Sequence, residues 1–216
     1  MKISEVTNAF EVGKFAVNAE FLKSKKNKKK PKKILLQSNL INLEYTIDTE
    51  IFSKKNSHVY FFCVNDKIVK IGASESSIKD NMNYYVQRAI EGGFSPTRFM
   101  CHMLIYAHLK LQNEIKIHAI TYKNVDVRIK DLDSISQQNV GLSSKDLEQI
   151  CIKQYYDKYN EYPEWNLQEQ SKGYPEEILE LINSYREFRK KKKHSLHNNN
   201  DELISHFRRC ENYNLM

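Results

Sequence analysis

The sequence predicts an α+β fold: a small antiparallel or mixed β-sheet built around one β-hairpin and flanked by helices, with helical extensions at both ends. Three observations predict it. A β-branched and aromatic run at residues 58–64, turn residues at 65–67 and a second apolar run at 68–72 form a hairpin pattern. Helical patterns follow at 78–90 and 97–112 and again after Ser143. Residues 114–122 alternate apolar and polar side chains, as a strand with one wet face does.

The composition is that of a folded protein without a membrane anchor. The chain has 216 residues, of which 40% are hydrophobic and 28% charged. No apolar run reaches the roughly 20 residues that a transmembrane helix needs, and the first residues lack a signal-peptide layout. The four cysteines form no CxxC pair, so neither a zinc ribbon nor a disulfide scaffold is expected. The sequence therefore predicts a cytoplasmic protein.

The positive charge is concentrated near the two ends of the chain. The net charge is +7, and we expect an N-terminal basic extension at 1–50 and a C-terminal helical basic extension at 171–216. Within the first extension, the spacing of apolar residues predicts a helix over 6–22 and short extended segments at 34–36 and 43–47. Both lysine-rich blocks are expected either to remain solvated or to bind the phosphates of a nucleic acid without reading its sequence. The residues expected to bind DNA phosphates are Lys28, Lys29, Lys30, Lys32, Lys33, Arg189, Lys190, Lys191 and Lys192.

The central zone, 51–170, is predicted to be the functional core. After the hairpin, the helix at 78–90 stops at a glycine pair, and the helix at 97–112 follows a Ser-Pro step. Ser143 and Asp146 have the spacing of a capping box. The helix that they open is expected to carry Leu147, Ile150, Cys151 and Tyr155 on one face.

The hairpin residues resemble a known pair of motifs. Val59-Tyr60-Phe61 and Lys70-Ile71-Gly72, with ten residues from Tyr60 to Lys70, are similar to the paired motifs of the GIY-YIG nuclease superfamily. Many members, including restriction-endonuclease-like ones, have Lys-Ile-Gly in place of Tyr-Ile-Gly. The resemblance covers about 57–166 and implies a GIY-YIG-like fold with a catalytic hairpin.

The resemblance continues downstream. Members carry an arginine on the first helix after the hairpin and a histidine or tyrosine four residues later, which places both on one helical face. Arg98 and His102 match this spacing, with 73–95 as an insertion, and Arg88 is the reserve candidate for the arginine. A metal-binding helical glutamate and a later asparagine complete the pattern, which here implies Glu148 and Asn166.

The residue types suit phosphodiester hydrolysis. Tyr60 would orient or deprotonate the attacking water, and Lys70 would favour the phenolate by lowering the pKa of Tyr60. Arg98 would bind phosphate oxygens with its planar guanidinium, and His102 would transfer a proton or hold the phosphate. Glu148 would anchor one Mg²⁺ or Mn²⁺ ion per active site. By resemblance, Gly72 and Asn166 support the site without reacting.

The hairpin offers an internal check on this mechanism. A three-residue loop, 65–67, would pair Phe62 with Lys70 and place Tyr60 and Lys70 on one face. A two-residue loop, Asn65-Asp66, would pair Phe61 with Lys70 and place Tyr60 on the other face unless the hairpin contains a bulge.

These observations predict a type II site-specific deoxyribonuclease that acts on double-stranded DNA, as a homodimer by analogy with such enzymes, without a small-molecule cofactor. A phage- or repair-type GIY-YIG endonuclease of low specificity is one alternative, and a non-catalytic basic nucleic-acid-binding protein is another. A third is the restriction fold with a Glu-x-Lys strand, for which Glu114-Ile115-Lys116 is available although no Pro-Asp precedes it.

Overall fold

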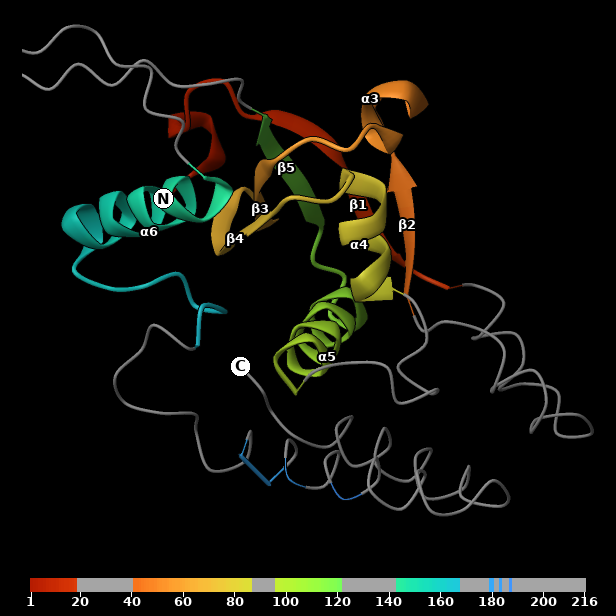
Figure 1. Cartoon of the computed structure of the whole chain (residues 1–216). Helices are drawn as coiled ribbons and strands as arrows, with labels where there is room; N and C mark the ends of the chain where they lie inside the picture. The colour runs from red at the N-terminus through yellow and green to blue at the C-terminus, as the bar shows by residue number, and fades with distance from the viewer. Residues whose placement is uncertain are drawn as a thin grey trace, which may run out of the picture. The chain divides into compact units, whose positions relative to one another are not determined.

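The computed structural model describes residues 1–18, 41–86, 96–121 and 143–167, together with the helical residues 179, 180, 183 and 187. Five strands form one sheet in the order β2-β1-β5-β3-β4, and helices flank this sheet (Figure 1). The predicted α+β fold is confirmed. The strands are β1 (Phe10–Val17), β2 (Ile41–Tyr45), β3 (His58–Val64), β4 (Lys67–Ser74) and β5 (Ile115–Thr121). The helices are η1 (Ile3–Glu5), α3 (Thr49–Ser53), α4 (Ile78–Val86), α5 (Pro96–Lys110) and α6 (Ser144–Tyr159).

The predicted hairpin consists of strands β3 and β4. Its loop has two residues, Asn65 and Asp66, and is therefore the shorter of the two predicted alternatives. Asn65 and Asp66 have φ angles of 47° and 69°, so both adopt the left-handed conformation that two-residue hairpin loops require. Val64 pairs with Lys67 and Cys63 with Ile68. The register then shifts by one residue between Phe62 and Cys63. This β-bulge makes Phe62 the partner of Lys70 despite the two-residue loop.

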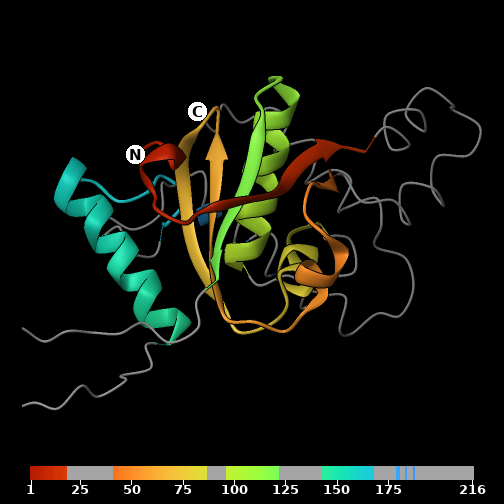
Figure 2. The same cartoon turned by 90° about the horizontal axis from the view of Figure 1, so that it is seen from above.

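Helix α6 covers one face of the hairpin, as both views show (Figures 1 and 2). Ile152 and Tyr155 of α6 join Val59, Phe61 and Ile71 of the strands in one buried cluster. The predicted capping box is present, because the Ser143 hydroxyl accepts from the Asp146 N–H and the Asp146 carboxylate accepts from the Ser143 N–H.

The predicted apolar face of α6 is partly wrong. Ile150 is 40% exposed, whereas Ile152, which lies about 200° further round the helix, is buried. The buried side of α6 is therefore the one that carries Ile152 and Tyr155 together, three residues apart.

The helix predicted over 6–22 is wrong for residues 10–17, which form strand β1. This strand pairs with β2 in antiparallel orientation, from Gly13 opposite Tyr45 to Val17 opposite Ile41. A Cβ atom on Gly13 would lie 2.2 Å from the carbonyl oxygen of Glu44, so the two strands approach too closely there for any side chain. Glycine also disfavours a helix interior, and β-pairing prevails over the helix-like spacing of the apolar residues.

The remaining element predictions agree with the structure where it describes them. Ile115, Ile117 and Ala119 of β5 are buried, as the alternation predicted. α5 follows its predicted range closely and buries residues around its whole circumference, as an apolar core helix does. No helix in the described part of the chain combines the length and the apolar character needed to cross a membrane.

The chain divides into two compact units. The first comprises Met1–Val12, Thr46–Asn81 and Lys116–Glu169 and contains the hairpin and α6. The second comprises Gly13–Tyr45, Met82–Ile115 and Gln170–Met216 and contains β2 and α5. The predicted domain boundaries near 50 and 170 stay predictions, but β1 and β2 belong to the sheet although they precede residue 50.

Candidate active site

Tyr60, Phe62, Lys70 and Gly72 share the face of the hairpin opposite to α6. Tyr60 pairs with Gly72 and Phe62 with Lys70, and paired residues of antiparallel strands project to the same side. The face is nearly closed to solvent, since Tyr60 is 5% exposed and Lys70 is 8% exposed. The β-bulge is what brings Lys70 to this face, because an unbulged two-residue hairpin would turn it the other way.

The ring of Tyr60 lies directly across Gly72. A Cβ atom on Gly72 would be 2.3 Å from both the Cζ and the hydroxyl oxygen of Tyr60, far inside normal contact distance. The ring of Phe62 packs beside it, with the two centroids 5.3 Å apart. Because Gly72 has no side chain, the phenol end of Tyr60 occupies the space above it. This space determines the position of the Tyr60 hydroxyl.

The segment that follows α6 closes the outer edge of β4. The Ile71 N–H donates to Asn166 Oδ1 at 2.8 Å, and Asn166 Nδ2 donates to the Ile71 carbonyl at 2.9 Å. The Trp165 N–H donates to the carbonyl of the bulged residue Val69 at 2.7 Å. Asn166 thus occupies the place of a neighbouring strand and holds β4 in position beside the site.

His58 and Asn81 belong to the same face but were not singled out from the sequence. His58, two residues before Tyr60, is buried, and its Nδ1 lies 2.9 Å from the carbonyl oxygen of Asn56. Its Nε2 lies 3.2 Å from Nδ2 of Asn81 on α4. Nδ1 therefore carries the proton, and Nε2 accepts from the amide. Burial lowers the pKa of His58. The available sequence signal was its period-2 spacing from Tyr60.

Arg98 and His102 both lie on α5, in the second unit. The guanidinium carbon of Arg98 lies 4.2 Å from the ring centroid of Tyr84. His102 is buried, and its Nδ1 lies 2.6 Å from the carbonyl oxygen of Tyr85. Burial lowers the pKa of His102 to about 4, so the ring is neutral at pH 7 and donates to this carbonyl.

The first helix after the hairpin is α4, and α5 is the second. Over its described range, Ile78–Val86, α4 contains no arginine, and its tyrosines stand four residues after Asp80 (Tyr84) and after Asn81 (Tyr85). Helix α4 lies within 73–95, the stretch that the resemblance treats as an insertion, and Arg98 lies on the helix that follows it. Arg88 lies outside the described residues, as do the two lysine-rich blocks near the ends of the chain.

Glu148 lies in the first turns of α6 and is half-buried. It precedes Ile152 by one helical turn, on the helix that covers the face of the hairpin opposite to Tyr60 and Lys70. Burial, and secondarily the Glu148 carboxylate, raise the pKa of the Cys151 thiol to about 11. Among the residues that the structure describes, no three His, Cys, Asp or Glu side chains gather in a way that could hold a metal ion. One carboxylate fits Mg²⁺, which keeps most of its waters, but neither zinc nor a calcium cage.

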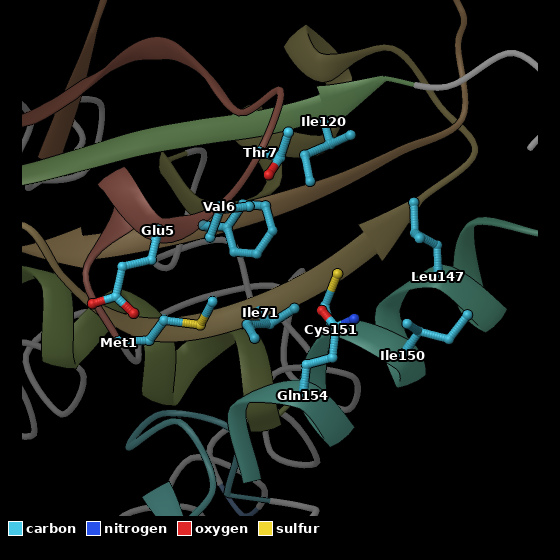
Figure 3. A pocket seen from close by; sticks show the side chains of 11 residues that line it. Met1, Glu5, Val6, Thr7, Ile71, Ile120, Leu147, Ile150, Cys151 and Gln154 are labelled. Carbon is cyan, nitrogen blue, oxygen red and sulfur yellow. The ribbon is translucent and has the colours of Figure 1, made fainter. Parts of the chain in front are cut away.

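The α6 side of the hairpin also contains a cavity of about 300 Å³ (Figure 3). Its lining is mainly apolar, and Phe61 and Ile71 place it on the face opposite to Tyr60. The other lining residues are Met1, Glu5, Val6, Thr7, Ile120, Leu147, Ile150, Cys151 and Gln154.

The chain is similar to solved structures of other proteins. The chain is similar to the restriction endonuclease HPY188I in complex with product DNA, at 17% identity and a TM-score of 0.39, over 76% of this chain and 84% of that one. It is also similar to a mutant of bacteriophage T4 EndoII, at 16% identity and a TM-score of 0.43, over 73% and 91%. No protein-family model and no curated protein matches the chain. At these identities and scores, the two similarities assign no function to the chain.

Proposed function

We propose that the chain is a DNA endonuclease that hydrolyses phosphodiester bonds with one Mg²⁺ or Mn²⁺ ion, and that it is a type II restriction enzyme acting on double-stranded DNA. The supporting observation is the hairpin face. A β-bulge brings Lys70 to the side of Tyr60, and Gly72 leaves the space that holds the Tyr60 hydroxyl. A buried lysine on the same strand face as a tyrosine is a suitable arrangement for proton transfer.

In the proposed reaction, a water oxygen attacks phosphorus, and the water proton passes to Tyr60. The bond from phosphorus to the leaving oxygen breaks, and the departing alkoxide takes a proton from a solvent water. The ammonium of Lys70 favours the phenolate form of Tyr60, which is the form that accepts this proton. The guanidinium of Arg98 binds non-bridging oxygens of the phosphate. When bound at Glu148, the divalent ion supplies positive charge against the developing negative charge on the phosphate. His102 is proposed to support the phosphate site, and Asn166 to hold β4.

The homodimer is part of the proposal, because two active sites related by a two-fold axis would cut both strands of a palindromic site in one encounter. A repair- or phage-type endonuclease would have the same chemistry without a fixed recognition sequence. The restriction fold with a Glu-x-Lys strand is a weaker candidate, since no Pro-Asp precedes Glu114-Ile115-Lys116.

A non-catalytic DNA-binding protein is the second candidate, and two specific observations favour it. Tyr60 and Lys70 have little exposed surface, and the helix that carries Glu148 covers the other face of the hairpin. Under this proposal, the hairpin face would be a structural core, and the lysine-rich blocks would supply the affinity for phosphate.

Nicking of supercoiled plasmid distinguishes these candidates. Wild type should nick DNA only with Mg²⁺ or Mn²⁺, and Tyr60→Phe and Glu148→Ala should each lose about 100-fold or more in rate. Glu114→Gln is the matched control, and its rate should equal that of wild type. Retained activity in Glu148→Ala with loss in Glu114→Gln would support the Glu-x-Lys strand instead. Absence of cleavage on any DNA would leave the binding protein.

Sequencing the ends of cleaved plasmid then tests site specificity. One recurrent palindrome at the ends is expected of a type II restriction enzyme. Scattered ends would contradict it and favour the low-specificity endonuclease.

A further inference from the structure

Tyr84 is an aromatic residue on the outer side of α4. The neighbouring residues Met82, Tyr85 and Val86 are buried, whereas Tyr84 is 51% exposed. An aromatic ring with half its surface in water gains little from packing, so its exposed position does not follow from the stability of the core.

The ring of Tyr84 instead contacts a cation. The guanidinium carbon of Arg98 lies 4.2 Å from the ring centroid, inside the range of about 6 Å over which a cation–π interaction acts. Arg98 is half-buried in the first turn of α5. Both residues belong to the second compact unit, so the contact is defined within one body.

A stacked guanidinium keeps its chemistry for phosphate. The interaction with the ring uses the face of the guanidinium, while its N–H donors lie in its plane and can bind two phosphate oxygens side by side. The stack also restricts a long side chain that would otherwise lose rotamer freedom on binding, which reduces the entropic cost of the contact.

We propose that Tyr84 is a positioning residue for Arg98, which holds the guanidinium ready for a phosphate of the DNA backbone. This inference rests on the proposed function, in which Arg98 binds phosphate. Tyr84 does not touch the reacting atoms and acts through Arg98. An aromatic ring, and not the hydroxyl, is the required feature.

The test measures binding of a fluorescein-labelled DNA duplex to the full chain in EDTA, where cleavage does not contribute. Tyr84→Leu should weaken binding roughly two- to fivefold, the range of an exposed cation–π interaction. Tyr84→Phe should restore it because the ring remains. Tyr45→Leu makes the same change at another tyrosine exposed on β2, 39% against 51%, and should bind as wild type does.

A double-mutant cycle separates positioning from general damage. In an Arg98→Ala background, Tyr84→Leu should have no further effect on binding. Equal weakening by Tyr84→Leu with and without Arg98, or weakening by Tyr84→Phe as large as by Tyr84→Leu, would overturn the proposal.

The NMR signal of the Arg98 Nε–H gives a readout that needs neither DNA nor activity. Tyr84→Leu should remove the ring-current shift of this signal, and Tyr84→Phe should keep it. If the wild-type protein binds the duplex but cuts no DNA, the proposed nuclease activity is refuted. The double-mutant cycle then still tests whether Tyr84 positions Arg98. Wild type that does not bind the duplex would refute both.

Discussion

Substitution of Gly72 by alanine tests the central geometry of the hairpin face. The new Cβ atom would lie 2.3 Å from both the Cζ and the hydroxyl oxygen of Tyr60, whereas favourable carbon contacts lie at about 3.5–4.0 Å. The phenol end must therefore move by about 1 Å or more. Tyr60 is buried beside Phe62, so the ring has little room to move without disturbing its neighbours.

Two effects follow from this displacement. Overpacking of this kind costs about 1–3 kcal/mol of folding stability, which is roughly 2–12 °C in melting temperature for a chain of this size. A displacement of about 1 Å at a reacting group can lower the rate about 100-fold. We therefore expect Gly72→Ala to remain folded at low temperature but to lose about 100-fold in plasmid nicking with Mg²⁺.

Gly13→Ala is the matched control, because its Cβ atom would also clash, at 2.2 Å from a backbone oxygen, but on β1 away from the hairpin. It should lower the melting temperature and leave the nicking rate of the folded protein near that of wild type. In a Tyr60→Ala background, Gly72→Ala should cost no stability, since the ring that it meets is gone. Nicking by Gly72→Ala within threefold of wild type would refute the argument that the Tyr60 hydroxyl must sit above Gly72.

Three further predictions concern stability and salt. Asn166→Ala leaves the buried N–H and carbonyl of Ile71 without these two partners and should lower the free energy of unfolding by about 2–4 kcal/mol in urea denaturation, and an unchanged midpoint would contradict the edge-closing role. His102 has its pKa lowered to about 4 in the folded state, below the usual unfolded value near 6.5, so stability should fall as pH drops from 6.5 to 4, by about 3 kcal/mol for this group. His102→Gln should flatten that part of the pH profile, and an equally steep profile would assign the loss to other groups. Deletion of either lysine-rich block, Lys28–Lys33 or Arg189–Lys192, should reduce the salt dependence of duplex binding without abolishing cleavage, and an unchanged slope would exclude the block from the phosphate contacts.

The hairpin could be predicted because its signals are local. A β-branched and aromatic run, two turn residues that tolerate the left-handed conformation and a second apolar run are sufficient to identify it. The bulge at Val69 could not be predicted, because it depends on pairing between strands and on the Trp165 N–H that binds the bulged carbonyl from 96 residues away. Tyr60 and Lys70 therefore share one face of the hairpin as predicted, but through a two-residue loop with a bulge and not through a three-residue loop.

Two other differences have physical causes that composition does not reveal. The apolar residues of β1 have a helix-like spacing, whereas its pairing with β2 and the close approach of Gly13 to the Glu44 carbonyl identify it as a strand. The buried pair His58 and Asn81 joins two elements 23 residues apart, so neither residue shows its partner in the sequence. The hydroxyl of Tyr60, the ammonium of Lys70 and the guanidinium of Arg98 could be proposed from residue type. The hydrogen bonds that join distant elements, such as those of Asn81 and Asn166, could not be predicted from the sequence.

The closed edge of β4 restricts how two copies of this chain can associate. Strands at the margin of a sheet often recruit a second molecule by extending the hydrogen-bond ladder from one subunit into the next. At Val69 and Ile71 that ladder is already complete within the chain, through a main-chain amide and an asparagine side chain. A continuous sheet across two subunits could not form through these residues unless the segment 163–166 first detached. The proposed homodimer must therefore use side-chain surfaces or another strand, and its interface should survive substitutions on β4 that leave the fold intact.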